Sequence, residues 1–175
     1  MVENIILTGF MAAGKSSVGR ILAQELDWEF LDTDQRIEQL TGLKIPEIFR
    51  RYGEKRFRSE ENLFVKKIAD ITKTVIATGG GTVLDKENWQ GLQQLGVTIH
   101  LYVPLEVALQ RIKRRQDRPL LDKSIPEIEQ MWKERLTIYN QAEITIDTTD
   151  QDIDTIVVEI LKQVKGGYPN NATKN

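Results

Sequence analysis

Short apolar segments alternate with amphipathic segments along almost the whole chain. The apolar segments are rich in branched side chains, as buried β-strands are. We expect strands at residues 4–8, 29–31, 74–77, 97–103 and 144–147. Between them apolar side chains recur at every third or fourth position, which predicts helices. This alternation favours a parallel sheet with helices on both faces.

The pattern predicts a single α/β domain over residues 1–165, because neither a linker nor a repeat interrupts it and the 175-residue length suits one domain. Residues 166–175 lack apolar periodicity, and we expect them to form a flexible tail. No apolar run reaches the roughly 18 residues of a membrane-spanning helix. The first residues also lack the features of a signal peptide. We therefore expect a cytoplasmic protein that does not bind membranes.

The composition excludes several kinds of chemistry. The chain has no cysteine, which excludes disulfides, thiolate metal sites and a cysteine nucleophile. Its single histidine, His100, excludes a multi-histidine metal site, and we interpret it as a structural residue of a strand. Lys plus Arg number 24 and Asp plus Glu number 26, and the net charge of −2 offers no general attraction to nucleic acid.

One contiguous motif carries the strongest functional signal. Residues 9–16 fit G-x-x-x-x-G-K-[ST] directly after a predicted strand and before a predicted helix. In such a loop the backbone N–H groups surround phosphate oxygens, Lys15 reaches the β- and γ-phosphates, and the Ser16 hydroxyl can ligate Mg²⁺. An ordinary glycine turn is the alternative, which the strand-loop-helix context disfavours. The guanine-specific N/TKxD motif does not occur in the sequence, which favours ATP over GTP.

A pair of carboxylates follows the second predicted strand. Asp32 and Asp34 stand at its carboxyl end, where open parallel sheets bind their ligands. We expect different tasks for them: Asp32 holds Mg²⁺ through water, and Asp34 faces an acceptor hydroxyl. The alternative is that Asp34 only N-caps the helix that resumes at about Gln35.

Basic residues are concentrated between residues 50 and 58. Arg58 follows Phe57, and Glu61 lies three positions further along the expected helix, where it can orient the guanidinium. An arginine fork beside aromatic rings suits a small ligand with a carboxylate and an apolar ring face. The alternative is that the whole stretch is a solvated basic face.

Three consecutive glycines, Gly79, Gly80 and Gly81, follow the third predicted strand. A plain turn rarely uses three glycines, because each costs conformational entropy. They allow a ligand to approach the backbone and to accept hydrogen bonds from it. Close approach of a neighbouring backbone is the structural alternative.

A further arginine is marked by its helical spacing. Ile128, Trp132, Arg135 and Tyr139 follow a 4-3-4 pattern, so Arg135 lies on the row that otherwise packs inward. An arginine in that row needs an anion or must extend to solvent. A substrate carboxylate would satisfy it, and so would a nearby Glu.

These motifs occur in the order and spacing of one family. From about residue 4 to residue 165 the chain resembles shikimate kinase, a small P-loop kinase of the nucleoside-monophosphate-kinase type. The resemblance rests on the glycine loop, Asp32-Thr33-Asp34, Gly53-Glu54-x-x-Phe57-Arg58 and Ala77-Thr78-Gly79-Gly80-Gly81. Arg118-Pro119-Leu120-Leu121 is similar to the lid signature of the family, and Arg135-x-x-x-Tyr139 to its last substrate-binding element.

The resemblance implies a three-layer α/β/α P-loop kinase fold with a five-stranded parallel sheet, a substrate-binding region at about 33–61 and a mobile lid at about 116–123. It implies ATP and shikimate as substrates, with Mg²⁺, and transfer to the 3-hydroxyl of shikimate. The residues expected at the nucleotide are Gly9, Met11, Ala12, Ala13, Gly14, Lys15, Ser16, Ser17, Arg111 and Arg118. Those expected at shikimate are Asp34, Arg58, Gly79, Gly80, Gly81 and Arg135. Lys15, Asp34 and Arg118 would be catalytic, and Ser16 and Asp32 would serve the metal.

Some alternatives stay open at the level of sequence. Asp34 is either the base or only orients the hydroxyl, because a loose transition state demands little early deprotonation. A kinase of another small sugar acid such as gluconate would share the loop and fold, without needing Arg58 and Arg135 at one carboxylate. A catalytically inactive nucleotide-binding relative would be expected to have lost acceptor residues, which are present here. We expect a monomer, since no exposed apolar repeat is predicted.

Overall fold

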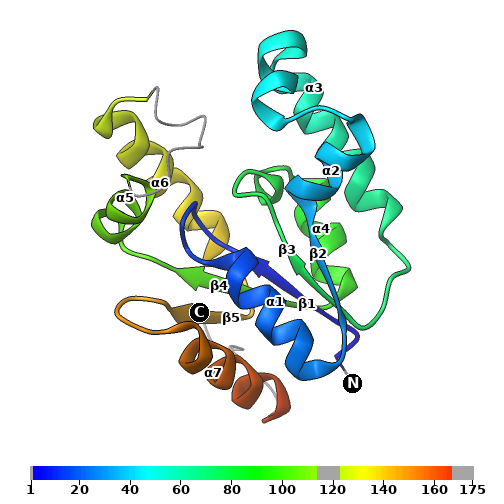
Figure 1. Cartoon of the computed structure of the whole chain (residues 1–175), viewed down its shortest axis with the longest axis vertical. Helices are drawn as coiled ribbons and strands as arrows, with labels where there is room; N and C mark the ends of the chain where they lie inside the picture. Colours follow the sequence, from blue (N-terminus) through cyan, green and yellow to red (C-terminus); the bar gives the residue numbers. More distant parts are fainter. Residues whose placement is uncertain (1, 114–122, 167–175) are drawn as a thin grey trace, which may run out of the picture.

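The sheet has five parallel strands in the order β2-β3-β1-β4-β5 (Figure 1). The computed structural model describes residues 2–113 and 123–166. The strands are β1 (Asn4–Thr8), β2 (Glu29–Asp32), β3 (Thr74–Ala77), β4 (Val97–Tyr102) and β5 (Ile144–Asp147). Each lies where an apolar segment predicts it, with ends that agree to within one residue. The predicted parallel sheet is therefore confirmed.

Helices cover both faces of the sheet. They are α1 (Lys15–Leu26), α2 (Thr33–Thr41), α3 (Ile45–Lys67), α4 (Lys86–Leu95), α5 (Leu105–Lys113), α6 (Ile125–Tyr139) and α7 (Ile153–Lys165), with a 3-10 turn η1 at Thr82–Leu84. The connection from β1 to β2 crosses the sheet in one direction, and the connections between the later strands cross it in the other. Because such connections are right-handed, α1 lies on one face of the sheet and the later crossover helices lie on the other. α7 packs beside α1, and α3 packs against α4 (Figure 1). The predicted three-layer α/β/α architecture is confirmed.

The core lies between the sheet and these two helical layers. Ile6 of β1, Leu22 of α1, Leu92 of α4 and Ile160 of α7 are all fully buried. Burying a large apolar side chain stabilises the fold by about 1.5–3 kcal/mol relative to leaving it exposed. The strands therefore form a rigid base for the loops at their carboxyl ends. Among the described residues, no helix combines the length and apolar character that crossing a bilayer requires.

Two helices in the predicted substrate-binding region depart from expectation. α2 begins at Thr33, two residues before the expected start at about Gln35, because the Asp32 carboxylate caps it by accepting from the Gln35 N–H at 3.2 Å. The alternative that Asp34 is the N-cap is therefore wrong, and Asp34 lies inside the first turn. α3 is kinked at Gly53, whose φ of 79° is left-handed. The kink changes the direction of the helix before Arg58.

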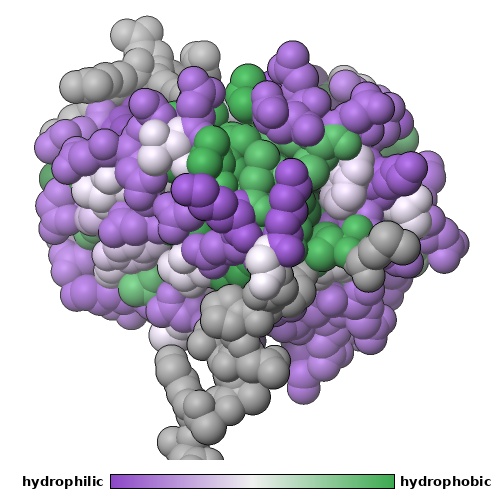
Figure 2. Space-filling model, turned by 90° about the horizontal axis from the view of Figure 1, so that it is seen from below, coloured by the Kyte–Doolittle hydropathy of each residue, from purple (hydrophilic) through white to green (hydrophobic). Residues whose placement is uncertain are grey.

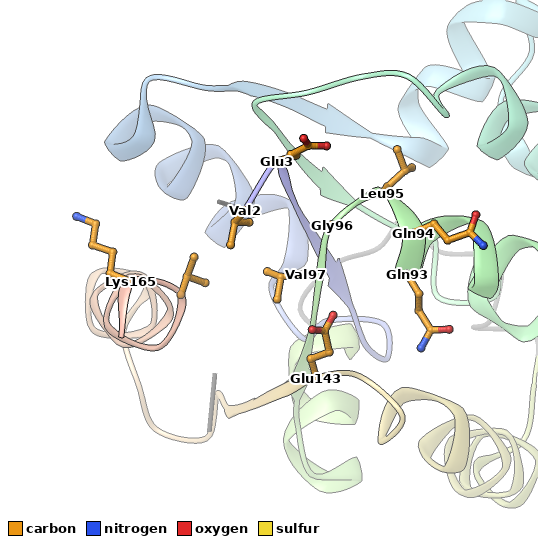
Figure 3. Close-up of a pocket in the computed structure, with 10 residues that line it drawn as sticks. Val2, Glu3, Gln93, Gln94, Leu95, Gly96, Val97, Glu143 and Lys165 are labelled. Carbon is orange, nitrogen blue, oxygen red and sulfur yellow. The ribbon is translucent and has the colours of Figure 1, made fainter. Parts of the chain in front are cut away.

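A pocket of about 520 Å³ lies at the amino ends of the strands, on the edge of the sheet away from the glycine loop (Figure 3). It is lined by residues 2–3, 93–97, 143 and 164–165. Seen from below in Figure 2, hydrophobic surface near the centre of the molecule is surrounded by hydrophilic residues. None of the predicted site residues lines this pocket. Open α/β sheets bind ligands at the other end of the strands, outside their carboxyl ends.

Candidate active site

The predicted site residues gather at the carboxyl ends of three neighbouring strands. β1 and β3 pair with each other, but the connections that leave them run to opposite sides of the sheet. Such a switch point is where open α/β sheets bind ligands. The glycine loop follows β1 and the glycine triplet follows β3. α2 and α3 rise on one side of the loop, and α5 and α6 on the other (Figure 1).

The glycine loop is fixed by its backbone conformation and by packing. Gly9 and Gly14 have φ values of 144° and 92°, which side chains rarely adopt. A Cβ on Gly9 would also lie 2.5 Å from the carbonyl oxygen of Leu101. Four loop side chains are buried against the core: Phe10, Met11, Ala12 and Ala13. The loop therefore leads directly into the N-terminus of α1, whose free N–H groups favour a phosphate.

Lys15 and the two serines after it form the first turn of α1. Lys15 Nζ donates to the carbonyl oxygens of Gly9 at 2.8 Å and Phe10 at 2.9 Å. The ammonium group is thereby held against the loop backbone, where the motif needs a cation for the β- and γ-phosphates. Ser17 is half-buried in the same turn.

Ser16 joins this turn to the end of β2. Its Oγ donates to Asp32 Oδ2 at 2.6 Å. Mg²⁺ in kinases is usually held by one or two protein oxygens together with phosphate and water oxygens. A hydroxyl and a carboxylate at the edge of the phosphate loop fit this preference. Over the described residues there is no cluster of three or more acidic or histidine side chains that would make a separate metal cage.

Asp34 carries a buried carboxylate oxygen that has no partner. Its Oδ1 accepts no hydrogen bond from any described residue. Burial raises the pKa of Asp34 from 3.8 to about 6, with help from Glu61 and Asp32, while Lys15 and Arg58 act in the opposite direction. A buried acceptor without a hydrogen-bond partner costs stability, and a hydroxyl of a bound ligand would supply the missing partner. Asp34 is therefore placed to accept a hydrogen bond from a ligand.

The glycine triplet leaves room for side chains that lie close to its backbone. A Cβ on Gly81 would lie 2.5 Å from Nη1 of Arg58, and one on Gly80 would lie 3.3 Å from Nη1 of Arg135. The side chains nearest to the triplet are Asp34 and Thr82 at Gly79, Arg135 and Tyr139 at Gly80, and Arg58 at Gly81. The alternative of a close neighbouring backbone thus has less support than the functional interpretation. The triplet brings the substrate-binding candidates from three helices together.

Arg58 turns inward while its basic neighbours do not. Its Nη1 donates to the buried Glu61 at 2.6 Å, and its Nη2 to the exposed Glu54 at 2.9 Å. The guanidinium also lies 5.5 Å from the centre of the Phe57 ring. Burial works against its charge, but the two carboxylates outweigh this and raise the pKa of Arg58. The solvated-face alternative holds for the remaining basic residues, which are exposed: Arg50, Arg51, Lys55 and Arg56.

Arg135 is held beside the triplet by a tyrosine one turn further along α6. Tyr139 is fully buried, and its hydroxyl donates to the carbonyl oxygen of Gly80 at 2.5 Å. Burial raises the pKa of Tyr139 to about 12, while Arg135, which hydrogen-bonds the same hydroxyl, acts against this. Behind Tyr139, burial lowers the pKa of His100 to about 4, so its ring is neutral and fills the core. This supports the structural interpretation of His100.

Arg111 lies on the other side of the glycine loop. Its guanidinium donates to the carbonyl oxygen of Ala12 at 3.1 Å and to that of Thr148 at 3.0 Å. It therefore connects the phosphate loop to the segment after β5. Arg118 lies outside the described residues, as do residues 114–122, which include most of the predicted lid.

Three threonines were missed by the interpretation of the sequence. Each is fully buried, and its hydroxyl bonds a group at the site: Thr33 accepts from the Gly79 N–H, Thr82 donates to Glu61, and Thr148 accepts from Arg111. They follow the carboxyl ends of β2, β3 and β5. For Thr33 and Thr148 the available signal was a polar residue directly after a strand of a parallel sheet, whereas Thr82 follows the glycine triplet.

A phosphate loop lies at the switch point of a parallel sheet, beside a glycine triplet on which two arginines and a carboxylate with an unpartnered oxygen converge. This arrangement defines a P-loop kinase for a small acceptor. The family model for shikimate kinase matches residues 11–165. A shikimate kinase of Pelotomaculum thermopropionicum is 44% identical over 166 residues, which cover 94% of this chain and 96% of that protein. The chain belongs to the shikimate kinase family.

Solved structures agree with this assignment. The shikimate kinase of Acinetobacter baumannii in complex with shikimate superposes with a TM-score of 0.90 at 38% identity, covering 99% of this chain and 97% of that one. The shikimate kinase of Aquifex aeolicus gives a TM-score of 0.84 at 36% identity, covering 93% and 96%. The similarity therefore spans the whole kinase fold.

Proposed function

We propose that this protein transfers the γ-phosphoryl group of ATP to the 3-hydroxyl of shikimate, giving 3-phosphoshikimate and ADP. Family membership supports this, as does the relative whose structure holds shikimate. The observation that carries the proposal is the convergence of Arg58, Arg135 and Asp34 on the glycine triplet. Two guanidinium groups suit a carboxylate, and an unpartnered carboxylate suits a hydroxyl. A small acceptor with both groups matches this distribution of charge.

On the nucleotide side, we assign the phosphates to the backbone of residues 9–17. Lys15 neutralises charge on the β- and γ-phosphates, and Arg111 lies toward the adenine. Ser16 and Asp32 hold Mg²⁺, which supplies charge neutralisation at the phosphate oxygens when it is bound. We also assign to Arg118, which lies outside the described residues together with most of the expected lid at about 116–123, the role of stabilising charge on the transferring phosphoryl group.

On the acceptor side, Arg58 and Arg135 bind the carboxylate of shikimate and the triplet lines its ring. Asp34 accepts the hydrogen bond of the 3-hydroxyl and orients its oxygen toward the γ-phosphorus. With a pKa of about 6 it is ionised at neutral pH. The proton then passes to Asp34 as the new O–P bond forms and the bond to the ADP oxygen breaks.

We further propose a domain organisation, an oligomeric state and a cellular location for the protein. Residues 1–165 form one kinase domain, with the acceptor bound in the region of about 33–61; the expected tail, apart from Gly166, lies outside the described residues. The enzyme acts as a cytoplasmic monomer. Light scattering of the purified chain at assay concentration should give about the 20.1 kDa mass of one chain.

The decisive experiment is ADP release from Mg-ATP with either shikimate or gluconate as acceptor. Shikimate-dependent turnover with little or none on gluconate is expected. Preference for gluconate would identify a kinase of another sugar acid. ATP binding without turnover on either acceptor would identify an inactive relative, and both of these results contradict the proposal.

A further inference from the structure

The buried partner of Arg58 is itself held by a hydroxyl. Glu61 is 1% exposed, and its Oε2 accepts from Arg58 Nη1. Its Oε1 accepts from Thr82 Oγ at 2.6 Å, and Thr82 is also 1% exposed. Both carboxylate oxygens are therefore paired, by groups from two separate elements.

We propose that Thr82 is a positioning residue of the acceptor site: its hydroxyl fixes Glu61, and through it the Arg58 guanidinium that binds the acceptor carboxylate. This inference rests on the proposed function. It predicts that the Thr82 hydroxyl governs affinity for the acceptor, not for ATP.

Thr82 can fix the position of another group, because its own backbone N–H and carbonyl groups are both hydrogen-bonded. Its N–H donates to the carbonyl oxygen of Gly79 at 3.2 Å, which closes the turn after β3. Its carbonyl oxygen accepts from the Asn88 side chain at 3.1 Å, in the first turn of α4. The backbone that carries the hydroxyl is thus held by the turn after β3 and by α4, whereas Arg58 and Glu61 lie on α3.

The direction of the hydroxyl also matters for Asp34. A Cβ on Gly79 would lie 2.9 Å from Thr82 Oγ and in contact with Asp34 Oδ1, so the glycine separates the two groups. An ionised carboxylate only accepts hydrogen bonds, so Thr82 must point its proton at Glu61. The proton is then not available to Asp34, whose Oδ1 stays unpartnered for the acceptor hydroxyl.

The second partner of Arg58 cannot replace this support. Glu54 has a side chain that is 64% exposed, against 1% for Glu61. Exposed ion pairs hold a geometry weakly, because water competes for both charges. If Glu61 loses its hydroxyl partner, the guanidinium is expected to lose its fixed direction toward the acceptor.

The test compares Thr82→Val, which keeps the shape and removes the hydroxyl, with Thr82→Ser, which keeps the hydroxyl. Hydrogen bonds to charged groups are the stronger kind, so we expect Thr82→Val to raise the KM for shikimate about five- to tenfold. The kcat and the KM for ATP should stay within about twofold, and Thr82→Ser should match the parent. An unchanged KM for shikimate in Thr82→Val, or equal rises in both KM values with a lower melting temperature, would overturn the inference.

A second measurement places the effect on Arg58. In an Arg58→Ala background, Thr82→Val should add no further rise in the KM for shikimate, because the group it positions is gone. A full additional rise would mean that Thr82 acts by another route. Absence of shikimate turnover in the parent enzyme would contradict the proposed function and this inference together. An active parent with no effect of Thr82→Val contradicts this inference alone.

Discussion

The two ends of the active site are built in different ways. The nucleotide end consists of the backbone of one contiguous loop, with Lys15 and Ser16 directly after it. The acceptor end consists of side chains from separate helices: Asp34 on α2, Arg58 on α3 and Arg135 on α6. Backbone N–H groups recognise any phosphate, whereas dispersed charges recognise one acceptor. Changes at the nucleotide end should therefore abolish turnover, and changes at the acceptor end should alter affinity or pH dependence.

The largest effect is expected at Lys15, whose ammonium group lies against the backbone of the glycine loop. Lys15→Met should lower kcat at least about a thousandfold, since a preorganised cation at the transferring phosphoryl group is lost. Steady-state ADP release measures this. Lys67→Met, at an exposed position of α3, is the control and should leave kcat unchanged. Substantial turnover by Lys15→Met would contradict the role of Lys15 at the phosphates, and with it the expectation that changes at the nucleotide end abolish turnover.

The next effect belongs to the acceptor end. Arg58→Ala should raise the KM for shikimate about a hundredfold, because two charge-assisted hydrogen bonds to the carboxylate are lost. The KM for ATP should stay within about twofold of the parent. Arg56→Ala is the matched control, since Arg56 is exposed in the same helix and pairs only with Glu60 among the described residues.

Arg58→Ala also leaves Glu61 buried without its cation, which destabilises proteins by several kcal/mol. Arg58→Lys avoids this problem, since it keeps the charge but not the planar fork. It should fold normally and still raise the KM for shikimate about tenfold. Weakened ATP binding with unchanged shikimate affinity in either variant would show that Arg58 belongs to the nucleotide end.

The difference between the two ends also explains which parts of the active site the sequence could predict. The glycine loop and the strands were predictable because their signals are contiguous or periodic. The local pattern singled out Arg58 through Phe57 and Glu61, but it left a solvated basic face as an alternative, because it did not show the kink at Gly53 that precedes Arg58. The Thr82–Glu61 hydrogen bond joins residues 21 positions apart, and no local pattern encodes that distance. Only the fold brings them together.

A third prediction concerns pH dependence at the acceptor end. Because the pKa of Asp34 is about 6, its carboxylate is ionised above pH 6 and loses its capacity to accept a proton below it. The kcat/KM for shikimate should therefore fall about tenfold between pH 7.5 and pH 5. A flat profile over this range would mean that Asp34 only orients the hydroxyl.

The stability of the protein should show the opposite trend at this residue. A carboxyl group whose folded pKa is raised stabilises the fold at low pH and loses that contribution as the pH rises through about 6. Asp34→Asn should therefore increase the free energy of unfolding at pH 7.5, by about 3 kcal/mol, with the gain shrinking toward pH 4. Urea unfolding at the two pH values measures this. Asp70→Asn, at an exposed position, should change neither value.

The smallest effect tests why the acceptor end needs its glycines. Gly81 has φ −104° and ψ −10°, which alanine adopts without backbone strain, so any loss of stability in Gly81→Ala comes from the displaced Arg58. The new methyl group would meet the end of Arg58 and displace it, which should raise the KM for shikimate about fivefold and leave the KM for ATP unchanged. Gly91→Ala in α4 is the control, since its methyl group would meet only Val65. If Gly81→Ala instead raises the KM values for ATP and shikimate equally, the triplet supports both ends of the active site. The division between a nucleotide end built from backbone and an acceptor end built from side chains would then not hold at the triplet.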